Sequence, residues 1–338
     1  MTNTEAGGLS EHEASKTSGP PVSVVLCTYN GEQFIEIQLT SILVQLGQND
    51  ELIIADDGST DDTPKILTRL LESLVERGIR LTMIPPNPTS RGISSNFARA
   101  VAHATNPVVI LSDQDDEWLP DRVDLVRREF AGSDGKLLAH SCDARLIDEN
   151  GSYLGHTQFE TVGMRHAEVE LLSGPKAFEF LARGSLLPGM TGAFDRNFLL
   201  RIGPAPETWP HDYWWFLHAA LFDGLRVTAD AYVNYRQHTN NTIGAVRPGV
   251  TQLVSRFWAT PSNAATFNQQ FSNFRSSAER FANDDRAQSH FEFAVMKSDF
   301  EARRASLPRN ILLRAVAVLR EIRSGQYSTF SRRGSLRG

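Results

Sequence analysis

The chain has 338 residues and a formal net charge of −6, with 41% hydrophobic and 22% charged residues. This composition is ordinary for a soluble globular protein, and the length allows one large or two modest domains. No apolar run approaches the roughly 20 residues of a membrane-spanning helix. Two cysteines, Cys27 and Cys142, are too few for a disulfide framework or a structural zinc site.

Strands and helices are predicted to alternate over the first 142 residues. Apolar runs predict strands at 22–28, 51–56, 80–84, 108–112 and 137–142, and helical patterns predict helices at 34–46, 61–76, 93–104 and 121–130. This alternation is typical of an α/β fold whose mostly parallel sheet is flanked by helices. Ligands of such sheets bind beyond the carboxyl ends of the strands.

The two ends of the chain differ from this α/β region, which is predicted to span residues 22–243. Residues 1–21 lack the hydrophobic block of a secretory signal, so we expect a disordered tail and a cytoplasmic protein. Residues 244–338 show helix-like segments punctuated by proline, which predict a helical C-terminal appendage.

Positive charge is concentrated at the C-terminal end. Residues 303–338 hold nine Arg and one Glu, a net +8, which leaves −14 for residues 1–302. Residues 307–323 form a basic amphipathic pattern, which fits either peripheral contact with the inner face of the cell membrane or packing onto the preceding domain. The acidic main region has no basic stripe interleaved with aromatics, so no nucleic-acid partner is expected.

Polar side chains follow three of the predicted strands, in residues 28–30, 56–59 and 113–116. The last segment packs three carboxylates within four positions, which repel one another unless a divalent cation binds them. An acidic loop that caps the next helix is the alternative. In the second segment, Ser59 or Thr60 could cap a helix, while Asp57 could accept a hydrogen bond from a pyrimidine N3–H.

Further motifs stand at residues 24–31, at Arg91-Gly92 and at residues 118–122. Together with the three polar segments, and in the same order along the chain, they resemble the inverting family 2 glycosyltransferases of the GT-A fold. The resemblance covers roughly residues 22–243 and implies a GT-A domain. It implies a nucleotide-sugar site formed by Thr28, Tyr29, Asn30, Asp57, Arg91 and Asp113. It also implies that Asp115 binds Mg²⁺ or Mn²⁺, and His238 offers a further metal ligand beside Arg236, a candidate for phosphate.

Residues 210–215 resemble the part of the family that carries the catalytic base, which would be Asp212. Inversion requires one base that takes the proton of the attacking hydroxyl. His211 departs from the commoner Glu and matches a subset that resembles rhamnosyltransferases of bacterial surface polysaccharides. An ordinary helix start with core aromatics is the alternative. Four further residues are expected on the acceptor or sugar side, namely Asp143, Thr191, Gly192 and Trp214.

Together these patterns predict a metal-dependent, inverting transfer of a sugar to a hydroxyl of a glycan or lipid-linked oligosaccharide. The donor implied is dTDP-rhamnose, or else a UDP-sugar. A non-catalytic nucleotide-sugar-binding or scaffold module of a polysaccharide assembly complex stays open as the alternative. A dinucleotide oxidoreductase, a P-loop kinase and a nucleotidyltransferase are disfavoured, because the glycine-rich phosphate loops of those classes are absent from the sequence.

Overall fold

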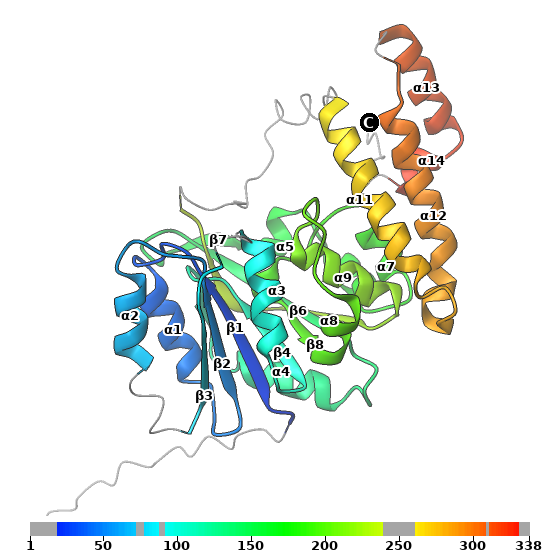
Figure 1. Cartoon of the computed structure of the whole chain (residues 1–338). Coiled ribbons are helices and arrows are strands. Elements are labelled where there is room, and N and C mark those ends of the chain that lie inside the picture. Colours follow the sequence, from blue (N-terminus) through cyan, green and yellow to red (C-terminus); the bar gives the residue numbers. More distant parts are fainter. Residues whose placement is uncertain (1–18, 72–77, 88–91, 239–260, 309–310, 331–338) are drawn as a thin grey trace, which may run out of the picture.

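The computed structural model of the chain describes residues 19–71, 78–87, 92–238, 261–308 and 311–330. Within these ranges nine strands form one sheet in the order β3-β2-β1-β4-β8-β6-β9-β5, with β7 paired to β6. Figure 1 shows this sheet between layers of helices, with a helical arm that rises from one side. The expected α/β fold with C-terminal helices is therefore confirmed.

The first half of the sheet is parallel. It contains β1 (Val22–Thr28), β2 (Glu51–Asp56), β3 (Arg80–Ile84) and β4 (Val108–Ser112). All residues of β1 and β4 are buried, as expected for parallel strands that helices cover on both faces. The carboxyl ends of these strands consequently lie at one edge of the sheet.

Helices cover the two faces of this half. They are α1 (Ile35–Leu43), α2 (Thr63–Leu71), α3 (Ile93–His103) and α4 (Arg122–Ala131). Val24 and Leu26 of β1 belong to the core under α1 and α2, whereas Val25 and Cys27 belong to the core that contains Phe97 of α3. Strand side chains alternate between faces, so one apolar strand supplies both cores.

The second half of the sheet is mixed. It contains β5 (Glu117–Trp118), β6 (Ala139–Ile147), β7 (Tyr153–Thr157), β8 (Ala193–Asp195) and β9 (Leu225–Arg236). Strand β8 is antiparallel to both β4 and β6, and it joins the two halves. The helical elements here are α5 (Gln158–Thr161), α6 (His166–Leu172), α7 (Ala177–Leu181), the 3₁₀ turn η2 (Gly189–Thr191), α8 (Arg196–Ile202) and α9 (His211–Leu221).

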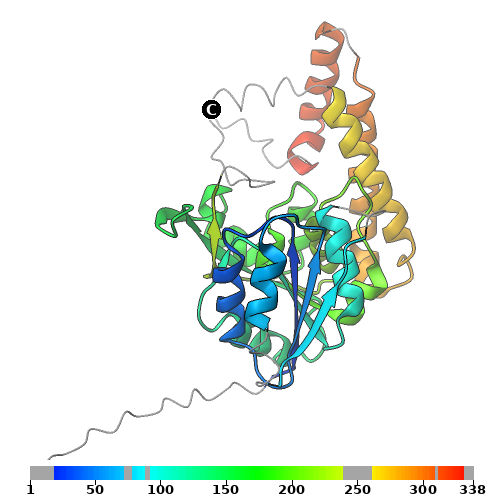
Figure 2. The ribbon, with the colours of Figure 1, turned by 60° about the vertical axis from the view of Figure 1, so that its left-hand side comes forward.

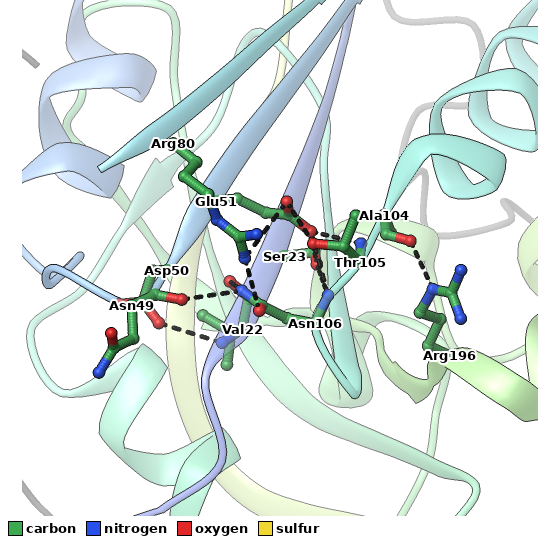
Figure 3. A network of polar contacts seen from close by, with 10 residues as sticks. All are labelled: Val22, Ser23, Asn49, Asp50, Glu51, Arg80, Ala104, Thr105, Asn106 and Arg196. Carbon is green, nitrogen blue, oxygen red and sulfur yellow. Dashed lines mark hydrogen bonds and ion pairs between the residues drawn. The ribbon is translucent and has the colours of Figure 1, made fainter. Parts of the chain in front are cut away.

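A polar network holds the amino ends of the strands together (Figure 3). The buried carboxylate of Glu51 accepts hydrogen bonds from Ser23, Thr105 and Asn106. The side-chain amide of Asn106 in turn donates from Nδ2 to the Val22 carbonyl at 2.7 Å. These bonds connect β1, β2 and the segment before β4, so they fix the relative position of the strands whose opposite ends carry the polar motifs.

The C-terminal helices are α11 (Pro261–Glu279), α12 (Asp285–Ala305), α13 (Ile311–Arg323) and α14 (Gln326–Phe330). Phe274 of α11 is fully buried against Trp209 and Trp214, which attaches the arm to the core of the α/β region. The buried ammonium of Lys297 donates to Glu301 at 2.7 Å and to the Phe330 carbonyl at 2.8 Å, which secures α14. No helix in the described ranges is long and apolar enough to cross a membrane.

The predicted boundary at residue 243 and residues 1–18 of the predicted tail lie outside the described residues. Both stay predictions.

Candidate active site

The loop after β1 is held from two sides. The backbone N–H of Tyr29 donates to Gln114 Oε1 at 2.7 Å, and Gln114 Nε2 donates back to the Tyr29 carbonyl at 3.0 Å. Asn30 has a φ of 49°, donates from its backbone to Ser59 Oγ at 2.8 Å and accepts from the Thr60 N–H at 2.9 Å. With its backbone fixed in this way, the Tyr29 side chain remains 53% exposed at the carboxyl edge of the sheet.

Asp56 and Asp57 at the end of β2 have different surroundings. Asp56 is saturated by Thr28 Oγ1 at 2.8 Å, by Ser59 Oγ and by two backbone N–H groups. Asp57 is 8% exposed and accepts one bond at Oδ2, from the Gly92 N–H at 2.8 Å. Its Oδ1 is buried and has no hydrogen-bond partner among the described residues. A buried carboxylate oxygen without a partner is costly, so this atom is ready for a ligand's donor.

Neither capping alternative from the sequence is found. Asp61 accepts from the Thr63 N–H at the start of α2, at 3.0 Å, whereas Ser59 is bonded to Asp56. The N-cap of α4 is Asp121, which makes no side-chain capping bond. The acidic segment 113–116 therefore does not cap the helix that follows it.

The three carboxylates after β4 differ in burial and in partners. Asp116 is fully buried and accepts from the Arg236 N–H at 3.1 Å. Asp115 Oδ2 lies 2.9 Å from His238 Nε2. Burial and the charges of Asp115 and Asp212 raise the pKa of Asp113 to about 8. Asp115 and Asp212 therefore lie close enough to Asp113 for their charges to act on it.

Phe34 supports the Asp115–His238 pair. Its ring lies 5.1 Å from the His238 imidazole and 4.8 Å from the Arg236 guanidinium, measured from the ring centroid. Arg236 is 1% exposed and donates to the carbonyls of Asp115 and Asp148. The expectation that Arg236 binds phosphate is therefore corrected, because its guanidinium is buried in this loop and orients Asp115.

Asp212 lies in the first turn of α9 and is the one residue of that helix that is not buried. Its Oδ2 accepts from the Gly189 N–H at 2.9 Å and its Oδ1 accepts from the Tyr213 N–H at 2.7 Å. A Cβ on Gly189 would lie 3.2 Å from His211 Nε2 and 3.4 Å from Asp212 Cβ. A glycine at this position thus lets the backbone approach the carboxylate closely.

His211, the departure from the commoner Glu, is buried. Its imidazole stacks on Phe97 with ring centroids 4.3 Å apart, and burial lowers its pKa, so the ring is neutral at pH 7. His211 therefore adds no positive charge beside Asp212.

The four residues expected on the acceptor or sugar side lie in the scaffold. Thr191 is fully buried and hydrogen-bonds Ser141 at 2.8 Å, and a Cβ on Gly192 would lie 2.7 Å from the Phe194 ring. Asp143 is buried and accepts from the Phe159 N–H at 2.9 Å, and Trp214 is 3% exposed and faces His218 and Phe274. These side chains thus contact other parts of the protein, and their place on the acceptor or sugar side stays a prediction.

Arg91 lies outside the described residues. Sequence reasoning missed the contacts of Gln114 with Tyr29 and of Phe34 with His238. The glycine at position 31 is the one sequence feature that relates to the first contact, because a Cβ there would lie 2.4 Å from Gln114 Oε1.

The fold is an α/β fold with carboxylates at the carboxyl ends of its parallel strands. The model of the family Glycosyl transferase family 2 matches residues 23–201. The chain belongs to this family, as the motifs predicted.

The curated proteins to which the chain is similar are also named as glycosyltransferases. The chain is 28% identical over 173 residues to an uncharacterised glycosyltransferase of Nostoc sp., with 51% of this chain and 48% of that protein covered. It is 27% identical over 235 residues to the dTDP-rhamnosyl transferase RfbG of Shigella flexneri, with 65% and 74% covered. The match thus spans about half of the Nostoc relative's length.

A solved structure shares the fold. Residues 1–349 of S. aureus TarS in complex with UDP-GlcNAc match with a TM-score of 0.53 and 16% identity, and the match covers 91% of this chain and 82% of that one. This likeness confirms the predicted GT-A fold.

Proposed function

We propose that the chain is an inverting, metal-dependent glycosyltransferase that moves a hexose or deoxyhexose from a nucleoside diphosphate to a hydroxyl, with Asp212 as the base. The observation that carries this proposal is the arrangement of Asp57, Asp113 and Asp115 at the ends of β2 and β4, with Asp212 within electrostatic reach of Asp113. Asp57, Asp113 and Asp115 would bind the donor, and Asp212 would take the proton of the acceptor hydroxyl.

The nucleoside would bind at the ends of β1 and β2. The unpartnered Oδ1 of Asp57 accepts the N3–H of uracil or thymine, and the exposed ring of Tyr29 supplies a face for the base. Thr28 and Asn30 shape the loop through their bonds to Asp56 and Ser59. Arg91 remains a predicted contact of the base or diphosphate.

Asp115 and His238 have side chains of the kind that bind Mg²⁺ or Mn²⁺, and Asp115 Oδ2 lies 2.9 Å from His238 Nε2. Within the described ranges, no three His, Cys, Asp or Glu side chains converge on a complete metal site. Donor oxygens and water would therefore have to complete the coordination. When bound, the cation neutralises the charge of the departing diphosphate.

The chemical step is a direct displacement. The acceptor oxygen forms a bond to the anomeric carbon as the bond from that carbon to the diphosphate oxygen breaks, and the hydroxyl proton passes to Asp212. The Gly189 and Tyr213 N–H groups donate to this carboxylate and hold it in one orientation. The product has inverted configuration because the hydroxyl attacks opposite the leaving group.

Rhamnose is the sugar we propose first. The similarity to a dTDP-rhamnosyl transferase over 74% of that protein supports it, as does the His211-Asp212 pair. The acceptor would be a glycan or lipid-linked oligosaccharide at the cytoplasmic side of the membrane, with UDP-sugars as alternative donors. A non-catalytic module of a polysaccharide assembly complex is the second candidate.

Calorimetric titration tests the donor and the metal together. Purified protein is titrated with dTDP-rhamnose, UDP-glucose, UDP-galactose and GDP-mannose, with Mg²⁺ or Mn²⁺ and then with excess chelator. We expect one dTDP- or UDP-sugar to bind in a metal-dependent way, and we expect Asp115→Ala to abolish the metal effect. Binding without subsequent transfer to any hydroxyl acceptor would favour the non-catalytic module.

A further inference from the structure

Helix α13 presents an apolar face to solvent. Val316, Leu319 and Ile322 are 59%, 52% and 36% exposed, and all three lie on one helix of 13 residues. At about 100° per residue, Val316 and Leu319 lie on the side of the helix opposite Glu321. Glu321 is buried, and its carboxylate lies 3.7 Å from Arg303 of α12. The helix therefore rests on α12 through one side and exposes the other.

The exposed side is also basic. Arg320 and Arg323 are exposed among the three apolar residues, and the one acidic residue of α13 is the buried Glu321. The exposed side chains of α12 include Glu292 and Asp299, so the combination of apolar and positive groups belongs to α13. We call the surface formed by Val316, Leu319, Arg320, Ile322 and Arg323 the α13 face.

The position of α13 relates this face to the active site. Figure 1 and Figure 2 both show α13 at the far end of the arm, beyond the side of the sheet toward which β1 and β2 point. The carboxyl ends of these strands carry Tyr29 and Asp57. The arm therefore extends toward the side of the molecule on which these strands end.

We propose that the α13 face docks on an anionic lipid bilayer. Thirteen residues make a helix about 20 Å long, too short to span a bilayer of about 30 Å. Such a helix lies in the interface, with its apolar side chains among the acyl chains and its arginines at the phosphates. The positive charge and the lack of exposed acidic groups on α13 select an anionic surface over a neutral one.

Docking through the α13 face would bring the chain to the surface in which lipid-linked acceptors are anchored. The proposal goes beyond the transfer reaction and does not depend on which sugar is transferred. Its test measures lipid binding alone, so its failure and the failure of the proposed reaction are distinguishable.

Co-sedimentation of the full chain with vesicles provides the test. Vesicles of phosphatidylglycerol and phosphatidylcholine are compared with vesicles of phosphatidylcholine alone. We expect binding to the anionic vesicles only. We expect Arg320→Glu/Arg323→Glu to weaken that binding on the order of tenfold or more, since two attractive charges near the surface become repulsive. Val316→Ser/Leu319→Ser should weaken binding through the apolar component.

Two exposed positions elsewhere provide matched controls, namely Val44→Ser after α1 and Arg128→Glu on α4. Both should bind like the wild-type chain. Absence of wild-type binding, α13 variants that bind normally, or controls that lose as much affinity would each overturn the proposal. It would also be overturned if sedimentation equilibrium showed that the α13 face joins two copies of the chain and is covered in that dimer.

Discussion

Asp57 provides a test of how the nucleobase is read. Its Oδ2 is occupied by the Gly92 N–H, so in Asp57→Asn the amide oxygen would stay with Gly92 and the NH₂ group would take the place of the open Oδ1. Two donors would then meet at the base N3–H. We expect the affinity for UDP or dTDP to fall about 10- to 100-fold, equivalent to about 1–3 kcal/mol. Calorimetry measures this change, and equal affinity in the variant would contradict it.

The exposed Asp62 offers a matched control for that experiment. Its side chain is 60% exposed and pairs with Lys65. Asp62→Asn should leave nucleotide affinity unchanged, because the lost charge is screened by solvent.

Gly189 should affect turnover and not donor binding. A Cβ there would press on the His211 ring at 3.2 Å and displace the N–H that holds Asp212. We expect Gly189→Ala to lower kcat by about tenfold, because small displacements of a catalytic group are costly, while the donor Kd stays constant. Steady-state kinetics with saturating donor measures this, with Gly174→Ala, which has space for a Cβ, as the control. A parallel loss of donor affinity would show that the effect is not confined to the base.

The side chains at strand ends could be predicted from the sequence, because polar residues after apolar runs identify the ligand-binding edge of a parallel sheet. Their partners could not. Gln114 is 85 positions from Tyr29, and Arg236 is 121 positions from Asp115. The burial of Arg236 and the packing of Trp214 depend on contacts across the fold, which neither residue type nor spacing reveals.

Among the elements, the amino-end network of Glu51 gives a stability prediction. Burial alone would raise the pKa of this carboxyl, but hydrogen bonds from Ser23, Thr105 and Asn106 outweigh it and lower the pKa below the ordinary 4.5. A lowered folded-state pKa means that the carboxylate stabilises the fold above pH 4.5, and that this contribution is lost as the pH falls through the lowered pKa.

We therefore expect Glu51→Gln to reduce the free energy of unfolding at pH 7 by about 1.5–3 kcal/mol, the contribution typical of hydrogen bonds to a charged group. Urea unfolding at pH 7 and at successively lower pH measures this. The difference between variant and wild type should shrink in acid. Glu36→Gln, at an exposed ion pair with Arg69, is the control and should change little. A constant difference at all pH values would refute the assigned role of the charge.

The long apolar strands β1 to β4 and the helices between them were predicted within a few residues wherever the structure describes them, since both periodicities are strong there. Residues 72–76 of the helix predicted at 61–76 lie outside the described residues. The short strands β5 and β8 were not predicted, because two or three residues carry no periodicity. Their antiparallel pairing depends on strands distant in the sequence. The mixed second half of the sheet consequently could not be derived from local pattern.

The whole molecule brings four distant segments to one place: the ends of β1, β2 and β4, and the start of α9. The Asp115–His238 pair adds the segment after β9. The core under α9 continues into α11 through Phe274, so the arm and the base-bearing helix share one packed interior. In the proposed mechanism, the groups that bind the nucleotide lie on the parallel half of the sheet, whereas the base, Asp212, lies on a helix of the mixed half.

The Asp212→Asn variant tests these separate roles most directly. Its rate of sugar transfer is measured in single turnover, and its donor affinity is measured by calorimetry. Asparagine keeps the shape and can still accept the Gly189 N–H, but it cannot take the acceptor proton. The account predicts a fall in transfer rate of about 10²- to 10⁴-fold, with donor affinity nearly unchanged and with the exposed Asp230→Asn fully active. Wild-type transfer by Asp212→Asn would contradict the assignment of the base and, with it, the proposed mechanism.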